Sequence, residues 1–268
     1  MNLIESLVLG IVQGLTEFLP VSSSGHLVIV QRFFNIVSEN LAFEVVVHLG
    51  TLLSVLVVFY DDIIKMIRSF FGGIIGKKVK ICYQEDYHFK LAILVIVGTV
   101  PAVIAGLFFN DFFKSIFHNV KLVGVTLLIT AVILFLTRFV TNRGKKLTFW
   151  KSVLIGIGQA MAIFPGISRS GTTISTSLYL GLNREEAARF SFLLSIPAIA
   201  GAAVLELSDL FKTGLVINQV WVLIIGFIAS FIVGYIAIRF LLRLIKTGKF
   251  SWFAPYCAAL GIFVLLFL

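Results

Sequence analysis

Six long apolar runs, separated by shorter polar and charged segments, dominate the pattern of this chain. A helix crosses a bilayer with about 20 apolar residues, and each run approaches or exceeds that length. The pattern therefore predicts an all-α polytopic membrane protein with six full crossings. The runs cover residues 42–60, 89–109, 120–138, 187–206, 219–241 and 252–268.

Two further segments, 3–34 and 150–181, have a different pattern. Each begins with an apolar stretch, continues with proline, serine and glycine residues, and ends with a second short apolar stretch. Helix breakers at membrane depth are tolerated only where the backbone is buried in protein or lines a wet cavity. We therefore expect each segment to form a re-entrant helical hairpin, which enters and leaves on the same side, rather than two crossings.

The two hairpin segments are copies of one another. With an offset of 146 residues and no gap, seven of the sixteen positions from 10 to 25 are identical. We therefore expect a single integral membrane domain, 1–268, made of two repeats, 1–140 and 150–268, each a hairpin plus three transmembrane helices. The copies differ at Glu17, Ser23 and His26 in the first, which correspond to Ile163, Arg169 and Thr172 in the second.

The charged residues indicate how the repeats are oriented. Of the 22 basic residues, 17 lie around the loops after the first, third and fifth crossings and before the fourth. The positive-inside rule places that side in the cytoplasm and both termini outside. The first hairpin then opens to the outside and the second to the cytoplasm, so the second repeat has the inverted topology. Inverted repeats with broken helices place their site where the repeats meet, near the midplane.

Composition supports a membrane protein and argues against other classes. The chain is 59% apolar and 13% charged, whereas a soluble domain averages about 45–50% and about 25%. The net charge of +9 does not indicate a nucleic-acid partner, because the basic residues lie between apolar runs. Cys82 and Cys257 offer neither a disulfide framework nor a metal spacing. Segment 61–80 predicts either a basic interfacial helix lying on membrane lipids or a solvated loop.

Arg169 is the strongest indication of a site. A cation at the centre of a bilayer costs about 2.5–3.5 kcal/mol on insertion scales, so it calls for a function. Its planar fork matches two phosphate oxygens, which a lysine cannot do. The alternative is a structural ion pair between Arg169 and Glu17.

Each copy places hydroxyl groups and a glycine at the start of a short helix. Serine is a favoured N-cap, and the free N–H groups of a helix start bind anions. Two such helix starts that meet head-on would hold a diphosphate, although each cluster alone is more often a cap or a packing patch. The predicted phosphate-binding residues are Ser22, Ser24, Gly25, Ser168, Arg169, Ser170, Gly171 and Thr172.

Glu17 lies one helical turn after Gln13 and shares its face. Their carboxylate and amide oxygens suit a hard divalent cation that also binds phosphate oxygens and water. The rival role for Glu17 is that of a general base. Gln159 repeats Gln13, but Ile163 stands where a second glutamate would be, so the second copy cannot supply the same ligands.

His26 follows Ser23 by three residues, on the same helical face if the helix begins near Ser22. It could deprotonate Ser23, attack phosphorus itself, or protonate the leaving group; the alternative is a purely structural histidine. Glu44 and His48 form another pair one turn apart, which we interpret as supporting residues or a proton path, and we expect Gln159 to support the site as well.

The string from Gln13 to His26, together with Pro165 to Gly171 and the segment Ser191–Pro197, closely resembles the undecaprenyl-diphosphatase family, the bacitracin-resistance proteins. The resemblance covers essentially the whole chain. It implies an enzyme of the bacterial plasma (inner) membrane that removes the terminal phosphate of a C55 isoprenyl diphosphate. That reaction recycles the lipid carrier for peptidoglycan and other wall polymers, and it protects against bacitracin.

The resemblance also assigns roles to residues. It implies a metal motif at Gln13 and Glu17, a catalytic Ser23 and His26, a phosphate-binding Arg169, a divalent cation (Mg²⁺ or Ca²⁺) and an outward-facing site. Position 13 is often glutamate in the family, so Gln13 removes one negative ligand. We expect phosphoryl transfer with Ser23 as nucleophile and His26 as its base, and direct attack by His26 is the rival. The alternative function is a lipid-carrier flippase or secondary transporter, and whether the chain forms a homodimer stays open.

Overall fold

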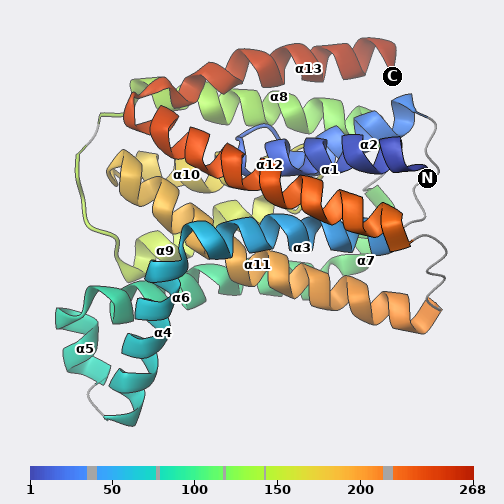
Figure 1. The fold of residues 1–268 in the computed structure, drawn as a ribbon. Coiled ribbons are helices and arrows are strands. Elements are labelled where there is room, and N and C mark those ends of the chain that lie inside the picture. Colours follow the sequence, from blue (N-terminus) through green and yellow to red (C-terminus); the bar gives the residue numbers. More distant parts are fainter. Residues whose placement is uncertain (35–40, 77–78, 117–118, 142, 214–219) are drawn as a thin grey trace.

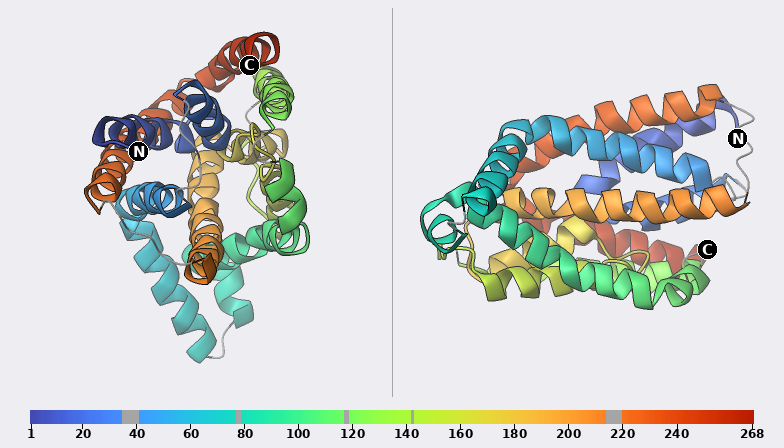
Figure 2. Two further views of the ribbon diagram at one scale, coloured as in Figure 1. Left: turned by 90° about the vertical axis from the view of Figure 1, so that its right-hand side faces the viewer. Right: turned by 90° about the horizontal axis from the view of Figure 1, so that it is seen from below.

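The computed structural model describes residues 1–34, 41–76, 79–116, 119–141, 143–213 and 220–268. Over these residues the chain is helical and contains no strand. The long helices lie side by side along one direction, and both termini lie at the same end of the bundle (Figures 1 and 2). The described part of the chain therefore has the all-α architecture that the apolar runs predict.

The helices follow the predicted runs closely. Five of them, α6, α8, α11, α12 and α13, are long and apolar enough to cross a membrane, and α3 becomes a sixth when it is counted together with α4. Outside the two hairpins, the helices are α3 (Leu41–Val58), α4 (Tyr60–Ile75), α5 (Val79–Glu85), α6 (Tyr87–Phe108), α7 (Asn110–Ile116), α8 (Val120–Leu136), α11 (Arg184–Thr213), α12 (Val220–Lys246) and α13 (Phe253–Phe267), with short 3₁₀ turns η1 (Thr137–Phe139) and η2 (Lys249–Trp252).

The chain bends by 78° between α3 and α4, so α4 runs across the bundle direction (Figure 1). Most of segment 61–80 is therefore helical and not a loop, but it is not one helix. Helix α4 ends at Ile75, where Gly72, Gly73 and Gly76 weaken helix formation. Residues 77 and 78 lie outside the described part, and α5 begins at Val79.

Most of the basic loop residues gather at one end of the bundle, which we call the basic end. It comprises α4, α5, residues 137–141 and 143–148 and the carboxyl end of α12, and the basic residues of these segments include Lys65, Arg138, Arg239 and Arg243. The two termini lie at the opposite end (Figures 1 and 2). The charge asymmetry seen along the sequence is therefore an asymmetry between the two ends of the folded bundle.

Each repeated segment forms two short helices joined by a non-helical tip. The first pair is α1 (Leu3–Phe18) and α2 (Ser23–Phe33), and the second is α9 (Phe149–Met161) and α10 (Arg169–Tyr179). Helix α1 stops before Pro20, because the residue before the proline, Leu19, is extended with ψ of 146°. The second tip turns at Gly166, whose φ of +91° is a conformation that glycine adopts readily.

Small residues allow the first helix of each hairpin to lie close against a long helix. The Ser6 hydroxyl donates to the Val222 carbonyl of α12, and the Ser152 hydroxyl donates to the Leu94 carbonyl of α6, both at 2.5 Å. One turn further on, a Cβ on Gly10 would lie 2.7 Å from the carbonyl oxygen of Gly226. Close packing of this kind is typical of helix pairs in membranes. It fixes α1 on α12 and α9 on α6.

Candidate active site at the hairpin tips

The two hairpin tips meet inside the bundle. Arg169 at the start of α10 donates from Nη2 to Glu17 Oε1 at the end of α1, over 2.8 Å. The Ser170 hydroxyl donates to the Leu19 carbonyl at 3.1 Å. A Cβ on Gly25 would lie 3.1 Å from the Cα of Gly166, so the backbones of the two tips nearly touch. The sequence predicts that the two hairpins meet at their tips, and the structure has the tips in contact.

The helix starts at the two tips are built in the same way. Ser22 caps α2 by accepting from the Gly25 N–H at 3.3 Å, and Ser168 caps α10 by accepting from the Gly171 N–H at 3.0 Å. The two serines are therefore N-caps, as the simpler interpretation held. The other N–H groups of each first turn have no partner within their helix, so they can bind an anion. Ser22 has φ of +71°, a strained conformation of the kind found at functional sites.

The remaining predicted phosphate-binding residues lie in these first turns. The hydroxyls of Ser22 and Ser24 are 3.3 Å apart, and so are those of Ser168 and Ser170. Thr172 is buried and turns its hydroxyl back to the Ser168 carbonyl at 2.8 Å. Thr172 thus stabilises the helix start, and in this arrangement its hydroxyl is already engaged.

Side chains of α8 and α13 hold the two tips. The Thr126 and Thr130 hydroxyls donate to the carbonyls of Pro165 and Gly166, at 2.5 and 3.0 Å. The Cys257 thiol donates to the Pro20 carbonyl at 3.6 Å. These bonds satisfy carbonyl groups that the non-helical tips leave without helical partners.

The Glu17 carboxylate is hydrogen-bonded to three side chains of the site. Besides Arg169, its carboxylate accepts from the Ser23 hydroxyl at 2.6 Å and from the Gln13 amide at 3.0 Å, both on Oε2. The side chain is buried, with only 8% of the residue exposed. The hydroxyl proton of Ser23 therefore points at a carboxylate, which is the geometry of a nucleophile and its base.

His26 is engaged elsewhere, which differs from the pairing expected from sequence. Its Nδ1 lies 2.7 Å from the Ser22 carbonyl, which can only accept, so Nδ1 carries a proton. In the neutral ring, Nε2 then accepts from the Tyr256 hydroxyl of α13 at 2.7 Å, and the two rings are stacked. Neither ring nitrogen bonds to Ser23. The physical reason is that side chains lean toward the start of their helix, so Ser23 reaches back to Glu17.

Several buried polar atoms at the tips have no hydrogen-bond partner among the described residues. They are Arg169 Nη1, Gln13 Oε1 and both amide atoms of Gln159. Buried polar groups in folded proteins are nearly always bonded, so these atoms mark places for a ligand. The ion pair between Arg169 and Glu17 exists, and the second terminal nitrogen of the same guanidinium is available to another acceptor.

The residues fit a divalent cation only in part. Among the described residues, no group of three or more histidine, cysteine, aspartate or glutamate side chains could hold a metal. Gln13 turns its amide nitrogen to the Glu17 carboxylate, so its Oε1, which has no partner among the described residues, would join Glu17 as a second oxygen ligand only after the amide rotates. A hard cation takes six or more oxygens. The donor set therefore suits a cation that a phosphate substrate helps to hold, and not a cage made of protein alone.

Glu44 and His48 lie beside the site without forming a side-chain pair. His48 Nδ1 donates to the Glu44 carbonyl at 2.7 Å, and its ring interacts electrostatically with Glu17. The Glu44 carboxylate instead accepts from the Gln31 amide of α2 at 3.0 Å. Gln31 and Tyr256 were not predicted from sequence. Tyr256 lies within an apolar run and 230 residues from His26, so no local signal indicates it.

The sequence is similar to known proteins over nearly its whole length. The family model described as "Bacitracin resistance protein BacA" matches residues 6–263. A protein of Desulforapulum autotrophicum named undecaprenyl-diphosphatase is 44% identical over 98% of this chain and 97% of its own length. Proteins of the same name from Carboxydothermus hydrogenoformans and Desulfosudis oleivorans are 43% and 46% identical, over 99% and 97% of this chain and 97% of their own length.

Proposed function

We infer that this chain is an undecaprenyl-diphosphatase, because it belongs to the bacitracin resistance protein BacA family. It is a multi-pass membrane protein that hydrolyses the terminal phosphate of undecaprenyl diphosphate, an isoprenyl diphosphate lipid. The products are undecaprenyl phosphate and inorganic phosphate. The reaction recycles the lipid carrier for wall synthesis, and removal of the diphosphate gives resistance to bacitracin.

The observation that carries the proposal is Arg169 at the junction of the tips. One of its terminal nitrogens pairs with Glu17, and the other is buried without a partner among the described residues. The helix starts at Ser23 and Arg169 add N–H groups on either side. A terminal phosphate between them would receive donors from both hairpins. Donors placed in advance in a water-poor site stabilise the charge of a transferring phosphoryl group.

The first chemical step uses Ser23 and Glu17. The Ser23 oxygen attacks the terminal phosphorus while Glu17 Oε2, already 2.6 Å away, takes the hydroxyl proton. The bond between that phosphorus and the bridging oxygen breaks, and the lipid leaves as its monophosphate. Water then hydrolyses the phosphoserine, which restores the serine and releases inorganic phosphate.

His26 and Tyr256 act in proton transfer and not as the nucleophile in this scheme. The Tyr256 hydroxyl and His26 Nε2 share a hydrogen bond and form a proton-carrying pair for the leaving group or the attacking water. Direct attack by Nε2 is the rival mechanism. It requires His26 to break its bond to Tyr256 first, whereas Ser23 is already bound to its base.

The cation belongs to the same proposal. The Glu17 carboxylate, and Gln13 Oε1 once its amide has rotated, would hold Mg²⁺ or Ca²⁺ together with diphosphate oxygens. Bound there, the cation would neutralise negative charge on the substrate. Glu17 would then be shared between the cation, Arg169 and Ser23.

We also propose that the two repeats have inverted topologies. Matching bonds support this: Ser6 to Val222 and Ser152 to Leu94 relate each hairpin to a helix of the other repeat. The positive-inside rule assigns the basic end to the cytoplasm. The termini and the first hairpin then face outward from the bacterial inner membrane, and the site opens there. Homodimer formation stays a prediction, to be checked by the mass of the purified protein in detergent.

The experiment is phosphate release in detergent. Purified protein is given undecaprenyl or farnesyl diphosphate without any membrane gradient, and inorganic phosphate is measured. We expect multiple turnovers with the wild type and none with Arg169→Ala. Folded wild-type protein that releases no phosphate, but moves a lipid phosphate across proteoliposomes, would instead establish the flippase or transporter alternative.

A further inference from the structure

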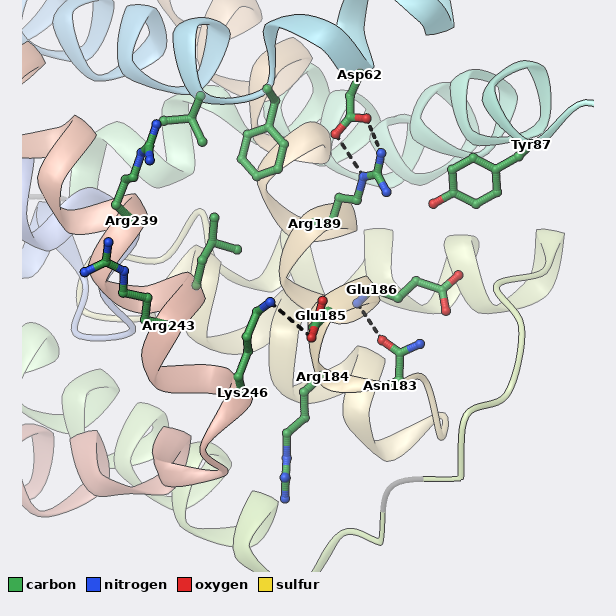
Figure 3. Close-up of a pocket in the computed structure, with 13 residues that line it drawn as sticks. Asp62, Tyr87, Asn183, Arg184, Glu185, Glu186, Arg189, Arg239, Arg243 and Lys246 are labelled. Atoms are coloured by element: carbon green, nitrogen blue, oxygen red, sulfur yellow. Dashed lines mark hydrogen bonds and ion pairs between the residues drawn. The ribbon is translucent and has the colours of Figure 1, made fainter.

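A polar cavity lies at the basic end, away from the hairpin tips. Its volume is about 950 Å³, and it opens between the ends of α3, α4, α6, α11 and α12 (Figure 3). None of the tip residues lines it. Its charged lining includes five cations, Arg184, Arg189, Arg239, Arg243 and Lys246, against three carboxylates, Asp62, Glu185 and Glu186.

Two of the cations are neutralised within the wall. Arg189 donates to both carboxylate oxygens of Asp62, with the Nε bond at 2.9 Å, and this bond joins α11 to α4. Lys246 reaches Glu185 at 3.2 Å, as Figure 3 shows. These pairs connect helices from three parts of the chain and so shape the cavity. Because each of these cations is already paired with a carboxylate, neither is available to bind an anion.

Three cations remain. The Arg184 guanidinium extends away from the other two and lies against Gly248 (Figure 3), so Arg239 and Arg243 together supply the free charge. They lie one turn apart on α12, so they share a face. Neither forms an ion pair with a carboxylate of the described residues. The Arg239 guanidinium lies over the Tyr235 ring at 5.0 Å. Stacking engages the planar face of the Arg239 guanidinium and leaves the N–H groups at its edge free for an acceptor.

The surroundings of these arginines point to a lipid as the source of the acceptor. Val58, Phe59 and Leu242 give the cavity an apolar wall next to the charges. The bend of 78° after α3 carries α4 across the bundle, as a helix at a membrane interface runs. Arginine forks match phosphate oxygens, and basic pockets between the ends of membrane helices suit anionic headgroups.

We propose that this cavity binds the phosphate of an anionic lipid headgroup, with Arg239 and Arg243 as the recognising residues. The site is separate from the hairpin tips and does not depend on the proposed hydrolysis. Free inorganic phosphate has the same chemistry, so the experiment must tell the two sources apart.

The test measures lipid binding to the purified full-length protein. Native mass spectrometry and thermal unfolding are followed with phosphatidylglycerol, phosphatidylcholine, undecaprenyl phosphate or inorganic phosphate. We expect retention and stabilisation with the anionic lipids, and neither with inorganic phosphate alone. We expect the double variant Arg239→Gln/Arg243→Gln to bind the anionic lipid at least about tenfold more weakly, because each interfacial cation contributes about 1 kcal/mol.

The matched control is Lys145→Gln/Lys146→Gln, which removes the same charge from the basic end but outside the cavity. It should bind the lipid as the wild type does. Equal weakening in the two double variants would overturn the proposal, since the effect would then be one of net charge. Stabilisation by inorganic phosphate that is as large as that by phosphatidylglycerol, and that is lost when Arg239 and Arg243 are replaced, would overturn the assignment to a headgroup. The single variants Arg239→Gln and Arg243→Gln give the same comparison if the double variant fails to fold.

Discussion

Arg169 Nη2 and Glu17 Oε1 lie 2.8 Å apart, although 152 residues separate them in the chain. Each stands at the tip of a broken helical hairpin, and each tip is a copy of the other. The pair joins the Arg169 guanidinium to the carboxylate that also accepts the hydrogen bond of Ser23. The predictions below test what this junction does.

Arg169→Lys should retain the fold and lose about 10²–10³-fold in kcat, because lysine keeps the charge but not the two-point geometry at phosphate. The assay is phosphate release from farnesyl diphosphate in detergent. Arg143→Lys, at an exposed loop position, is the matched control and should be fully active. Near-wild-type turnover by Arg169→Lys would make the residue structural.

Glu17→Gln should lower kcat by about 10²–10⁴-fold, because the amide cannot take the Ser23 proton. Ser23→Ala should lower it at least as far, and the double variant should be no worse than Ser23→Ala, since the two act as one unit. Rapid quenching of the wild type should yield phosphoserine in the peptide containing Ser23. Phosphate recovered on the imidazole of His26 would overturn this choice of nucleophile.

Tyr256→Phe should keep the ring stacked on His26 and lose the bond to Nε2. We expect kcat to fall by about three- to tenfold with KM unchanged, as a neutral hydrogen bond contributes about 0.5–1.5 kcal/mol. The pH–rate profile should shift, because Nε2 accepts the Tyr256 hydrogen bond only in the unprotonated ring. Tyr60→Phe, on the exposed start of α4, is the control. An unchanged profile would remove Tyr256 from the mechanism.

Removal of divalent cations by a chelator should abolish turnover, and Mg²⁺ or Ca²⁺ should restore it. Gln13→Glu should lower the cation concentration needed for half of the maximal rate, because it adds a negative ligand beside Glu17. Gln13→Leu should raise that concentration. Thermal stabilisation by the cation with a non-hydrolysable diphosphate provides a readout independent of turnover. Equal cation requirements in all three proteins would exclude ligation at this position.

Gly156→Ala should destabilise the fold, because the new Cβ would lie 2.2 Å from the Gly98 carbonyl oxygen. Overpacking of this kind costs about 1–3 kcal/mol. Gly10→Ala, which meets Gly226 in the matching place, should act in the same direction. Gly106→Ala is the control, since no atom lies within 4 Å of its Cβ. Its thermal midpoint in detergent should equal or exceed that of the wild type, and the same midpoint for Gly156→Ala would contradict the close packing.

Much of this molecule is encoded locally. The lengths of the apolar runs predict the long helices, because a crossing requires a fixed number of apolar residues. Pro20 and the serines at 22 and 168 predict the ends and starts of the hairpin helices, since backbone restriction and capping act over a few residues. The prediction that Arg169 takes part in a site also comes from sequence, because a cation in an apolar chain is costly without a purpose; its role in binding phosphate stays a prediction.

The tertiary structure alone decides which polar groups meet. Spacing suggested His26 as the partner of Ser23. In the packed structure, Ser23 is instead hydrogen-bonded to Glu17, and His26 is hydrogen-bonded to Tyr256. Local spacing could not predict these bonds, because a hydrogen bond depends on atomic positions within a few tenths of an ångström. Those positions are set by how rigid helices from distant parts of the chain pack, and the same packing creates the cavity at Arg239 and Arg243.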